Sequence, residues 1–262
     1  FYVCSILSLK VNVMANQKSI LKIEGTLDEL TFYKCGSNYH VRRKGGVSAA
    51  RIARDPAFAR SRENSKEFGL CAKSGKTLRQ AFSRQLIGFR DQFLIGRLAK
   101  ILHALKNLDA TSVRGARNVG IGIEAAGAKE LLKGFDFNNN AQLSGIFTQT
   151  LVLDPATGIM TLGSFDPRKQ LHPPAGATHF AIRSVWARID FVNNVFEQQE
   201  SNIENRALDT PASDIILTPP AVPQGTGTDV FAILLEFFQE VNGEQYPLQN
   251  GRFNGFRFVE VV

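Results

Sequence analysis

The stretch that decides the fold of this chain is residues 228–248, TDVFAILLEFFQEVNGEQYPL. From Val230 to Phe238, apolar residues occupy both faces of an extended chain, which is typical of a strand buried on both sides. The dipeptide Asn242-Gly243 follows, and it favours the tight type I′ turn of a β-hairpin. The stretch therefore predicts a long central strand that folds back on itself.

Other period-two segments after residue 135 predict further antiparallel strands. TLVLDPATGIMTLG, residues 150–163, predicts a hairpin with Asp154, Pro155 and Gly158 in its loop. In residues 177–199, ATHFAIRSVWARIDFVNNVFEQQ, the alternation slips by one residue, so we expect a β-bulge near Ser184. Residues 253–262, FNGFRFVEVV, supply a last strand. Together, the strands expected after residue 135 predict an antiparallel β-sandwich of jelly-roll type.

Helical periodicity dominates the part of the chain before residue 135. Asp55 is a natural N-cap and Pro56 suits the first helical position, so we expect one long helix or two abutting ones over residues 56–87. Residues 89–108 form an amphipathic pattern with leucines on one stripe and Arg97, Lys100 and Lys106 mostly on the other. A shorter helix is expected over residues 121–134, ending at Gly134.

A small antiparallel ribbon is expected ahead of the helices, over residues 20–46, ILKIEGTLDELTFYKCGSNYHVRRKGG. The change of period from 3.6 to 2 places the domain boundary at residue 135. The predicted fold is α+β, with a basic ribbon-plus-helices region at 20–134 and the antiparallel β-sandwich at 135–262. Residues 1–19 are an extension or leader.

The first residues, FYVCSILSLKVNV, precede Met14 and admit two interpretations. They resemble a signal peptide in being apolar, but Lys10 interrupts the apolar run and no basic residue precedes it. We therefore favour an extension ahead of a native start at Met14. No apolar run reaches the roughly 20 residues that a membrane span needs.

Charge is distributed very unevenly along the chain. Residues 1–118 contain 22 Lys and Arg against 8 Asp and Glu, a net +14, whereas residues 119–262 contain 9 against 16, a net −7. Such asymmetry suggests contact with nucleic acid, with a membrane surface, or between oppositely charged parts of two subunits.

The segment GLCAKSGKT, residues 69–77, resembles a phosphate-binding loop but does not meet its requirements. That loop needs four residues between its glycines, so that backbone N–H groups can surround a phosphate, and Gly69 and Gly75 are separated by five. The segment also lies inside a predicted helix rather than between a strand and a helix. We predict that Lys73 and Lys76 lie on a solvated helix face and that no nucleotide binds.

No catalytic or metal-binding pattern emerges from the sequence. Cys4, Cys35 and Cys71 lack zinc-site spacing, and the chain has no Gly-x-Ser-x-Gly nucleophile motif. His172 and His179 are the only histidines close together, and their spacing fits no zinc pattern. We assign no catalytic residue, metal or cofactor, although paired carboxylates could still meet in the fold.

The candidate contact residues are cations clustered between residues 42 and 76. Such clusters neutralise phosphates in nucleic-acid-binding proteins, or meet carboxylates of another subunit, and otherwise form an ordinary solvated surface. The residues concerned are Arg42, Arg43, Lys44, Arg51, Arg54, Arg60, Arg62, Lys73 and Lys76.

Part of the chain resembles uncharacterised proteins of Bacteroidota and their phages. Those proteins begin with a similar ribbon, continue into a basic helix that starts at Asp-Pro, and end in a β-rich part. The matching residues are Gly25, Phe32, Tyr33, Lys34, Val41, Arg42, Gly45, Gly46, Asp55, Pro56, Arg62 and Asn64. The resemblance covers about a quarter of the chain and implies an architecture, with no activity or catalytic residue.

The sequence therefore predicts a non-enzymatic structural subunit that self-assembles into a coat, shell or filament. Its basic N-terminal segment and acidic β domain would meet head to tail, and the plan resembles that of viral coat subunits. The alternative is a protein that binds the DNA or RNA backbone without sequence preference; a hydrolase ranks third. We expect synthesis in the cytoplasm followed by assembly, with secretion left open.

Overall fold

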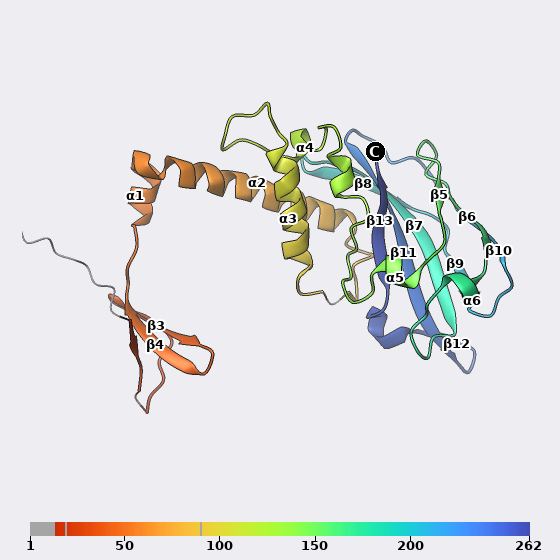
Figure 1. Ribbon diagram of the computed structural model, residues 1–262, viewed down its shortest axis with the longest axis horizontal. Coiled ribbons are helices and arrows are strands. Elements are labelled where there is room, and N and C mark those ends of the chain that lie inside the picture. The colour runs from red at the N-terminus through yellow and green to blue at the C-terminus, as the bar shows by residue number, and fades with distance from the viewer. Residues whose placement is uncertain (1–13, 19, 90) are drawn as a thin grey trace, which may run out of the picture. The chain divides into compact units, whose positions relative to one another are not determined.

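The computed structural model describes residues 14–18, 20–89 and 91–262. The chain divides into two compact units, one ending at Arg62 and the other running from Glu63 to Val262. The expected extension before Met14 lies outside the described residues, and of the predicted segment 1–19 only residues 14–18 are described. Figure 1 shows both units, and each is treated by itself below.

The N-terminal unit contains a four-stranded antiparallel sheet. Its strands are β1 (Met14–Asn16), β2 (Gly25–Leu27), β3 (Leu30–Cys35) and β4 (Asn38–Arg43), in the order β1-β4-β3-β2. Residues 20–24, the first part of the ribbon expected over residues 20–46, lie outside all four strands. Gly36 forms the β3–β4 turn with a φ of 62°, a conformation that favours glycine. A short helix, α1 (Ala49–Arg54), and a 3₁₀ turn, η1 (Pro56–Phe58), follow.

Helix α2 (Ala59–Ala81) is the long basic helix that the sequence predicts. The Asp55 carboxylate accepts a hydrogen bond from the Ala57 N–H at 2.9 Å, and Pro56 occupies the first position of the 3₁₀ turn. The predicted cap is therefore confirmed. The helix ends at Ala81, and turns occupy most of residues 82–89.

Helix α3 (Leu94–Asn107) is also confirmed, but the predicted helix at 121–134 is wrong. That segment contains only α4 (Val119–Gly122) and η2 (Lys129–Leu131), separated by turns. Gly127 between them has a φ of 74°, which breaks the helical path. At the end of α4, Gly122 allows close approach to α3, because a Cβ there would overlap the Leu105 carbonyl.

The second unit is built on a curled antiparallel sheet of six strands, so the protein is of mixed helix and sheet (Figure 1). The long strands β7 (His179–Asp190) and β11 (Thr228–Val241) pair at its centre. Outside them lie β8 (Val195–Glu200), β9 (Glu204–Ala207), β12 (Glu244–Pro247) and β13 (Gly255–Val261). A separate sheet contains β5 (Val152–Leu153), β6 (Met160–Phe165) and β10 (Ser213–Leu217).

Residues 228–248 form the long central strand and hairpin that their sequence predicts. Strand β11 is buried on both faces from Val230 to Leu235, and it pairs with β12 through a turn at Asn242 and Gly243, whose φ angles are 55° and 81°. Both angles are positive, as a type I′ turn requires. The hairpin of β5 and β6 is confirmed as well, with Asp154 and Gly158 closing its loop. Short helices α5 (Leu143–Ile146) and α6 (Pro167–Gln170) and the turn η3 (Leu248–Gly251) complete the unit.

The β-bulge predicted near Ser184 is wrong. Strand β7 pairs with β11 in one unbroken register from His179 to Ile189. The apparent slip has another cause, because each face of β7 lines a different core. Phe180, Ile182 and Trp186 enter one core and Val185, Ala187 and Ile189 enter the other.

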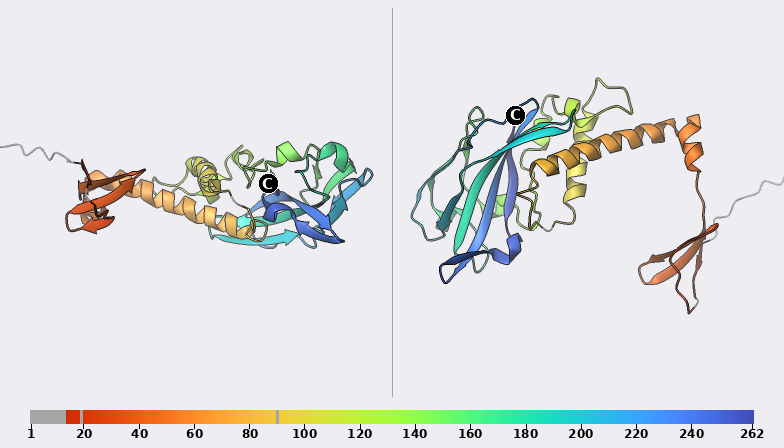
Figure 2. Two further views of the ribbon diagram at one scale, coloured as in Figure 1. Left: turned by 90° about the horizontal axis from the view of Figure 1, so that it is seen from below. Right: turned by 180° about the vertical axis from the view of Figure 1, so that it is seen from behind.

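The two cores lie on opposite faces of the six-stranded sheet. One joins helices α2, α3 and α4 to the sheet, and the other joins the sheet to the β5, β6 and β10 strands. Figure 2 shows the helices along one face of the sheet. The predicted boundary between residues 134 and 135 thus falls inside a single compact unit. The change of period marks a change from helices to strands, and the helices need the sheet to cover their apolar stripes.

Candidate partner-binding surface

Most described side chains of the N-terminal unit are exposed, and the others are half-buried. Among residues 15–18 and 20–62, none is buried. Leu27 and Leu30, which oppose each other on β2 and β3, are both exposed. Small sheets gain their stability from a covered apolar face, and the described residues of this unit do not form the core that normally supports one.

One face of this sheet combines an aromatic pair with a cation. Tyr33 and His40 oppose each other on β3 and β4 and stack at 5.5 Å between ring centroids. The Arg42 guanidinium lies 5.4 Å from the centre of the Tyr33 ring. On the other face, Lys22 and Lys34 flank the Tyr39 ring at 5.4 and 5.6 Å. Aromatic rings next to cations suit both nucleobases and protein side chains.

Three of the predicted contact residues are already engaged within the unit. Arg43 pairs with Glu29, and Arg51 pairs with Asp55 at 3.0 Å. Arg62 donates to the carbonyls of Ile52 and Asp55 at 2.7 and 2.9 Å, which satisfies the C-terminal end of α1. Their role is therefore structural in part.

The other predicted residues are divided between the two units. Within the described part of the chain, Arg42, Lys44 and Arg54 have no carboxylate partner, and all three are exposed. Arg60 is exposed on the first turn of α2. Lys73 and Lys76 belong to the second unit, on the solvent-facing side of α2, as predicted.

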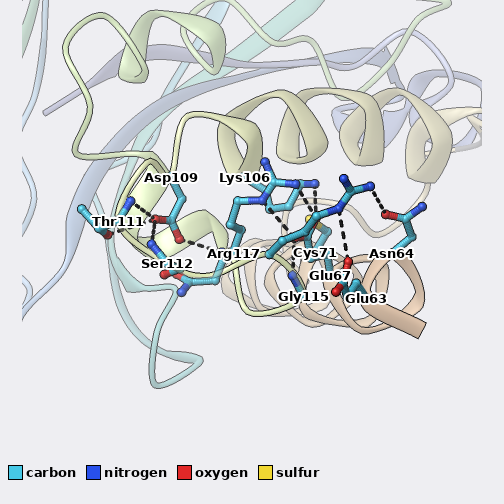
Figure 3. A network of polar contacts seen from close by, with 12 residues as sticks. Glu63, Asn64, Glu67, Cys71, Lys106, Asp109, Thr111, Ser112, Gly115 and Arg117 are labelled. Carbon is cyan, nitrogen blue, oxygen red and sulfur yellow. Dashed lines mark hydrogen bonds and ion pairs between the residues drawn. The ribbon is translucent and has the colours of Figure 1, made fainter. Parts of the chain in front are cut away.

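A buried ionic cluster in the second unit was missed by the sequence reasoning (Figure 3). Glu67 of α2 accepts from Lys106 Nζ at 2.5 Å, from Arg117 Nε at 2.9 Å and from the Gly115 N–H at 2.8 Å. The side chains of Glu67 and Lys106 are only 3% and 9% exposed. Lys106 had been placed on the polar stripe of α3, and this is corrected: it lies buried because the loop after α3 folds over it.

Asp109 organises that loop. Its carboxylate accepts hydrogen bonds from the N–H groups of Thr111, Ser112 and Asn118 at 3.1, 2.9 and 3.1 Å, and from the Thr111 hydroxyl at 3.0 Å. Burial by itself raises the pKa of Asp109, but these hydrogen bonds outweigh it and lower the pKa to about 2.

The same balance applies to Glu67. Burial raises its pKa, whereas hydrogen bonds from Arg117, Lys106 and the Gly115 N–H lower it to about 2. The two carboxylates remain ionised at every ordinary pH and hold α2, α3 and the loop together. A group so fully paired serves stability, because a catalytic acid or base must exchange its proton near the working pH.

Among the described residues, the cleft beside β13 brings together no convergent set of reactive groups. The cleft of about 560 Å³ beside β13 carries Lys133 and Arg257, and each already pairs with a carboxylate, Glu260 at 2.7 Å and Asp136 at 3.7 Å. Among the described residues, no group of three or more His, Cys, Asp or Glu is arranged to hold a metal ion.

Comparisons with known proteins add nothing to what this geometry indicates. No family model matches the chain, and no similar curated protein or solved structure was found. Within the described residues, no helix is both long and apolar enough to cross a membrane.

Proposed function

We propose that this protein is a non-enzymatic structural subunit that self-assembles into a coat, shell or filament, with the N-terminal unit as its arm. The observation that carries the proposal is the four-stranded sheet, in which none of the residues 15–18 and 20–62 is buried. A sheet of this size needs an apolar cover to be stable, and a neighbouring subunit supplies one.

Charge supports the same arrangement. The net +14 of residues 1–118 and the net −7 of residues 119–262 are complementary between copies. Moreover, the ion pairs of Arg43, Arg51, Lys106 and Arg117 use carboxylates that precede residue 119. A contact between unlike surfaces of identical chains is heterologous, and it propagates into rings, shells or filaments.

The second unit would form the body of the subunit. We propose that its two sheets constitute a β-sandwich of jelly-roll type. In support, the core around Phe180 and Phe231 contains side chains of both sheets, among them Leu162 and Ile215. Aligned sheets that share one core are the usual basis of such bodies.

A second candidate function is binding of the DNA or RNA backbone. The stacked pair of Tyr33 and His40 beside Arg42 favours it, since rings can stack on bases while cations neutralise phosphates. Assembly and nucleic-acid binding are compatible in a subunit that encloses a genome.

Light scattering coupled to size-exclusion chromatography tests the proposal at low and high salt, before and after nuclease. We expect large particles that persist after nuclease treatment and that shrink in the variant Arg42→Gln/Arg54→Gln. The matched control, Arg168→Gln/Lys169→Gln, removes two exposed cations of the second unit and should assemble normally. A small species at all salt concentrations would refute assembly. Tight, salt-sensitive binding of nucleic acid by that species would favour the second candidate.

A further inference from the structure

The helices cover only part of the sheet face on which they lie. Val185, Ala187 and Ile189 of β7 belong to the helix-side core. Because side chains alternate along a strand, Ala181 and Arg183 point to this same face, yet neither belongs to that core. Beyond that core the face combines charged side chains with the buried Ala181 and the half-buried Phe238.

Strand register identifies the side chains that share this uncovered region. Glu236 and Glu240 of β11 lie on the same face of the sheet as Leu234, the face that the helices partly cover. Glu200 of β8 lies opposite Val185 and shares this face. His179 begins the same phase of β7. We call this surface the open acidic face, and its charged or titratable members are Arg183, His179, Glu200, Glu236 and Glu240.

Negative charge is in excess on the open acidic face. Arg183 bridges two carboxylates, Glu200 at 3.2 Å and Glu236 at 2.7 Å, while Glu240 lies 3.4 Å from His179 Nε2. Three carboxylates thus face one guanidinium. Their side chains remain partly accessible, so they can meet a charged group from outside.

Unsatisfied polar atoms lie next to these carboxylates. Gln85 is 4% exposed and donates from Nε2 to Glu200 at 2.8 Å, but its Oε1 has no partner in the described residues. Arg183 Nε is likewise buried and unpaired, and so is Nε2 of Gln198, which lies two residues before Glu200. These atoms are enclosed by the fold, so an incoming chain can reach the partly accessible carboxylates beside them and not the atoms themselves.

We propose that the open acidic face receives the basic arm of a second copy of this chain, in the segment around Arg42, Lys44 and Arg54. This inference rests on the proposed assembly and names the acceptor in it. The three arm residues have no carboxylate partner among the described residues, whereas the face has carboxylates in excess. A nucleic acid is disfavoured as occupant, because its phosphates would meet Glu200, Glu236 and Glu240.

Such a contact joins two different surfaces of identical chains. The arm of one copy would bind the face of the next, whose own arm stays available, so the contact repeats without limit unless a ring closes. Partly desolvated ion pairs between the arm cations and the accessible carboxylates would set the register of the contact.

Complementation between two full-length variants tests the acceptor. Glu236→Gln/Glu240→Lys alters the face, and Arg42→Glu/Arg54→Glu alters the arm. We expect each variant alone to self-associate at least about tenfold more weakly than the unmodified chain, from two weakened ion pairs of roughly 0.7 kcal/mol each. A mixture of the two should regain association, because each supplies the surface that the other lacks. Glu124→Lys/Glu130→Gln is the matched control, since both carboxylates are well exposed and lie elsewhere.

Zero-length carbodiimide crosslinking of the unmodified chain gives a readout that needs no variant. Chains with natural and heavy nitrogen are mixed, and mass spectrometry identifies crosslinks between isotopically different copies. We expect Lys44 joined to Glu236 or Glu240 of another copy.

Several results would overturn this assignment. Crosslinks confined to one copy, or an assembly unaffected by Glu236→Gln/Glu240→Lys, would each refute the acceptor while leaving self-assembly in place. An association lost after nuclease would refute self-assembly as well, because nucleic acid would then hold the copies together. An unmodified chain that never associates would refute the proposed function and the acceptor together.

Discussion

Replacing Glu67 by Gln should destabilise the second unit by about 3 kcal/mol. The substitution keeps the shape of the side chain but leaves Lys106, only 9% exposed, without its counter-charge. Removing one partner of a buried ion pair costs about 3–5 kcal/mol, and the lower end applies because Arg117 keeps some contact with water.

The pKa of Glu67 leads to the same magnitude. Its value falls from 4.5 to about 2 in the folded protein, and one pKa unit corresponds to about 1.4 kcal/mol, so the ionised carboxylate contributes roughly 3 kcal/mol. The agreement supports Glu67 as a structural anchor of α2, α3 and the loop that follows.

Urea unfolding, followed by the fluorescence of the single tryptophan, measures the effect. With an m-value of about 3 kcal/mol/M, the midpoint should fall by about 1 M, and the melting temperature by about 6–12 °C. Glu63→Gln, one turn earlier on the same helix, is the control. Its 3.4 Å pair with Arg114 is partly exposed and should contribute less than about 1 kcal/mol.

A double variant separates the ion pair from its surroundings. Glu67→Gln/Lys106→Met removes both charges of the pair, and part of the lost stability should return because no lysine ammonium is left buried. If Glu67→Gln unfolds within about 0.5 kcal/mol of the unmodified chain, Lys106 and Arg117 do not depend on this carboxylate, and the reasoning fails.

Three further predictions follow from the described residues. First, the pKa of Glu67 is lower in the folded protein than its ordinary value, so the unfolded chain binds the extra proton at low pH. The ionised carboxylate therefore stabilises the fold fully above about pH 4.5, and this stabilisation is lost as the pH falls toward 2. Between these pH values, the urea midpoint of Glu67→Gln should vary less with pH than that of the unmodified chain. Second, Gly158→Ala should lower the free energy of unfolding by about 2–4 kcal/mol and shift the tryptophan emission, because Gly158 has a φ of 73° and a Cβ there would overlap the Trp186 ring. Gly163→Ala is the control, since a Cβ at Gly163 meets open space. Equal urea midpoints for the two variants would contradict this prediction. Third, a thiol reagent should label the exposed Cys35 in the native protein but reach Cys71 only after unfolding, because Cys71 is buried and burial raises the pKa of its thiol. Peptide mapping that finds Cys35 and Cys71 labelled at the same rate would contradict the buried position of Cys71.

Local features were readable in the sequence. The both-sided apolar run of β11, the Asn242-Gly243 turn and the Asp55 cap each depend on residues a few positions apart, and each is present in the structure. The exposed position of Lys73 and Lys76 follows from helix periodicity in the same way.

Features that depend on distant packing were not readable. Lys106 looks like a surface lysine until the loop around Gly115 and Arg117 closes over it. The slip in alternation near Ser184 looks like a bulge until both faces of β7 are seen to be covered by different elements.

The sequence by itself determined the long central strand, the two main helices and the opposite charges of the two parts of the chain. Backbone hydrogen bonds and side-chain periodicity act over a few residues, so these properties need no knowledge of the fold. The tertiary structure alone decided that Glu67 is a buried anchor and that Glu200, Glu236 and Glu240 share one face. Burial and convergence depend on which segments pack together, and the ion pairs that join residues 17, 39 and 53 positions apart form only in the folded chain.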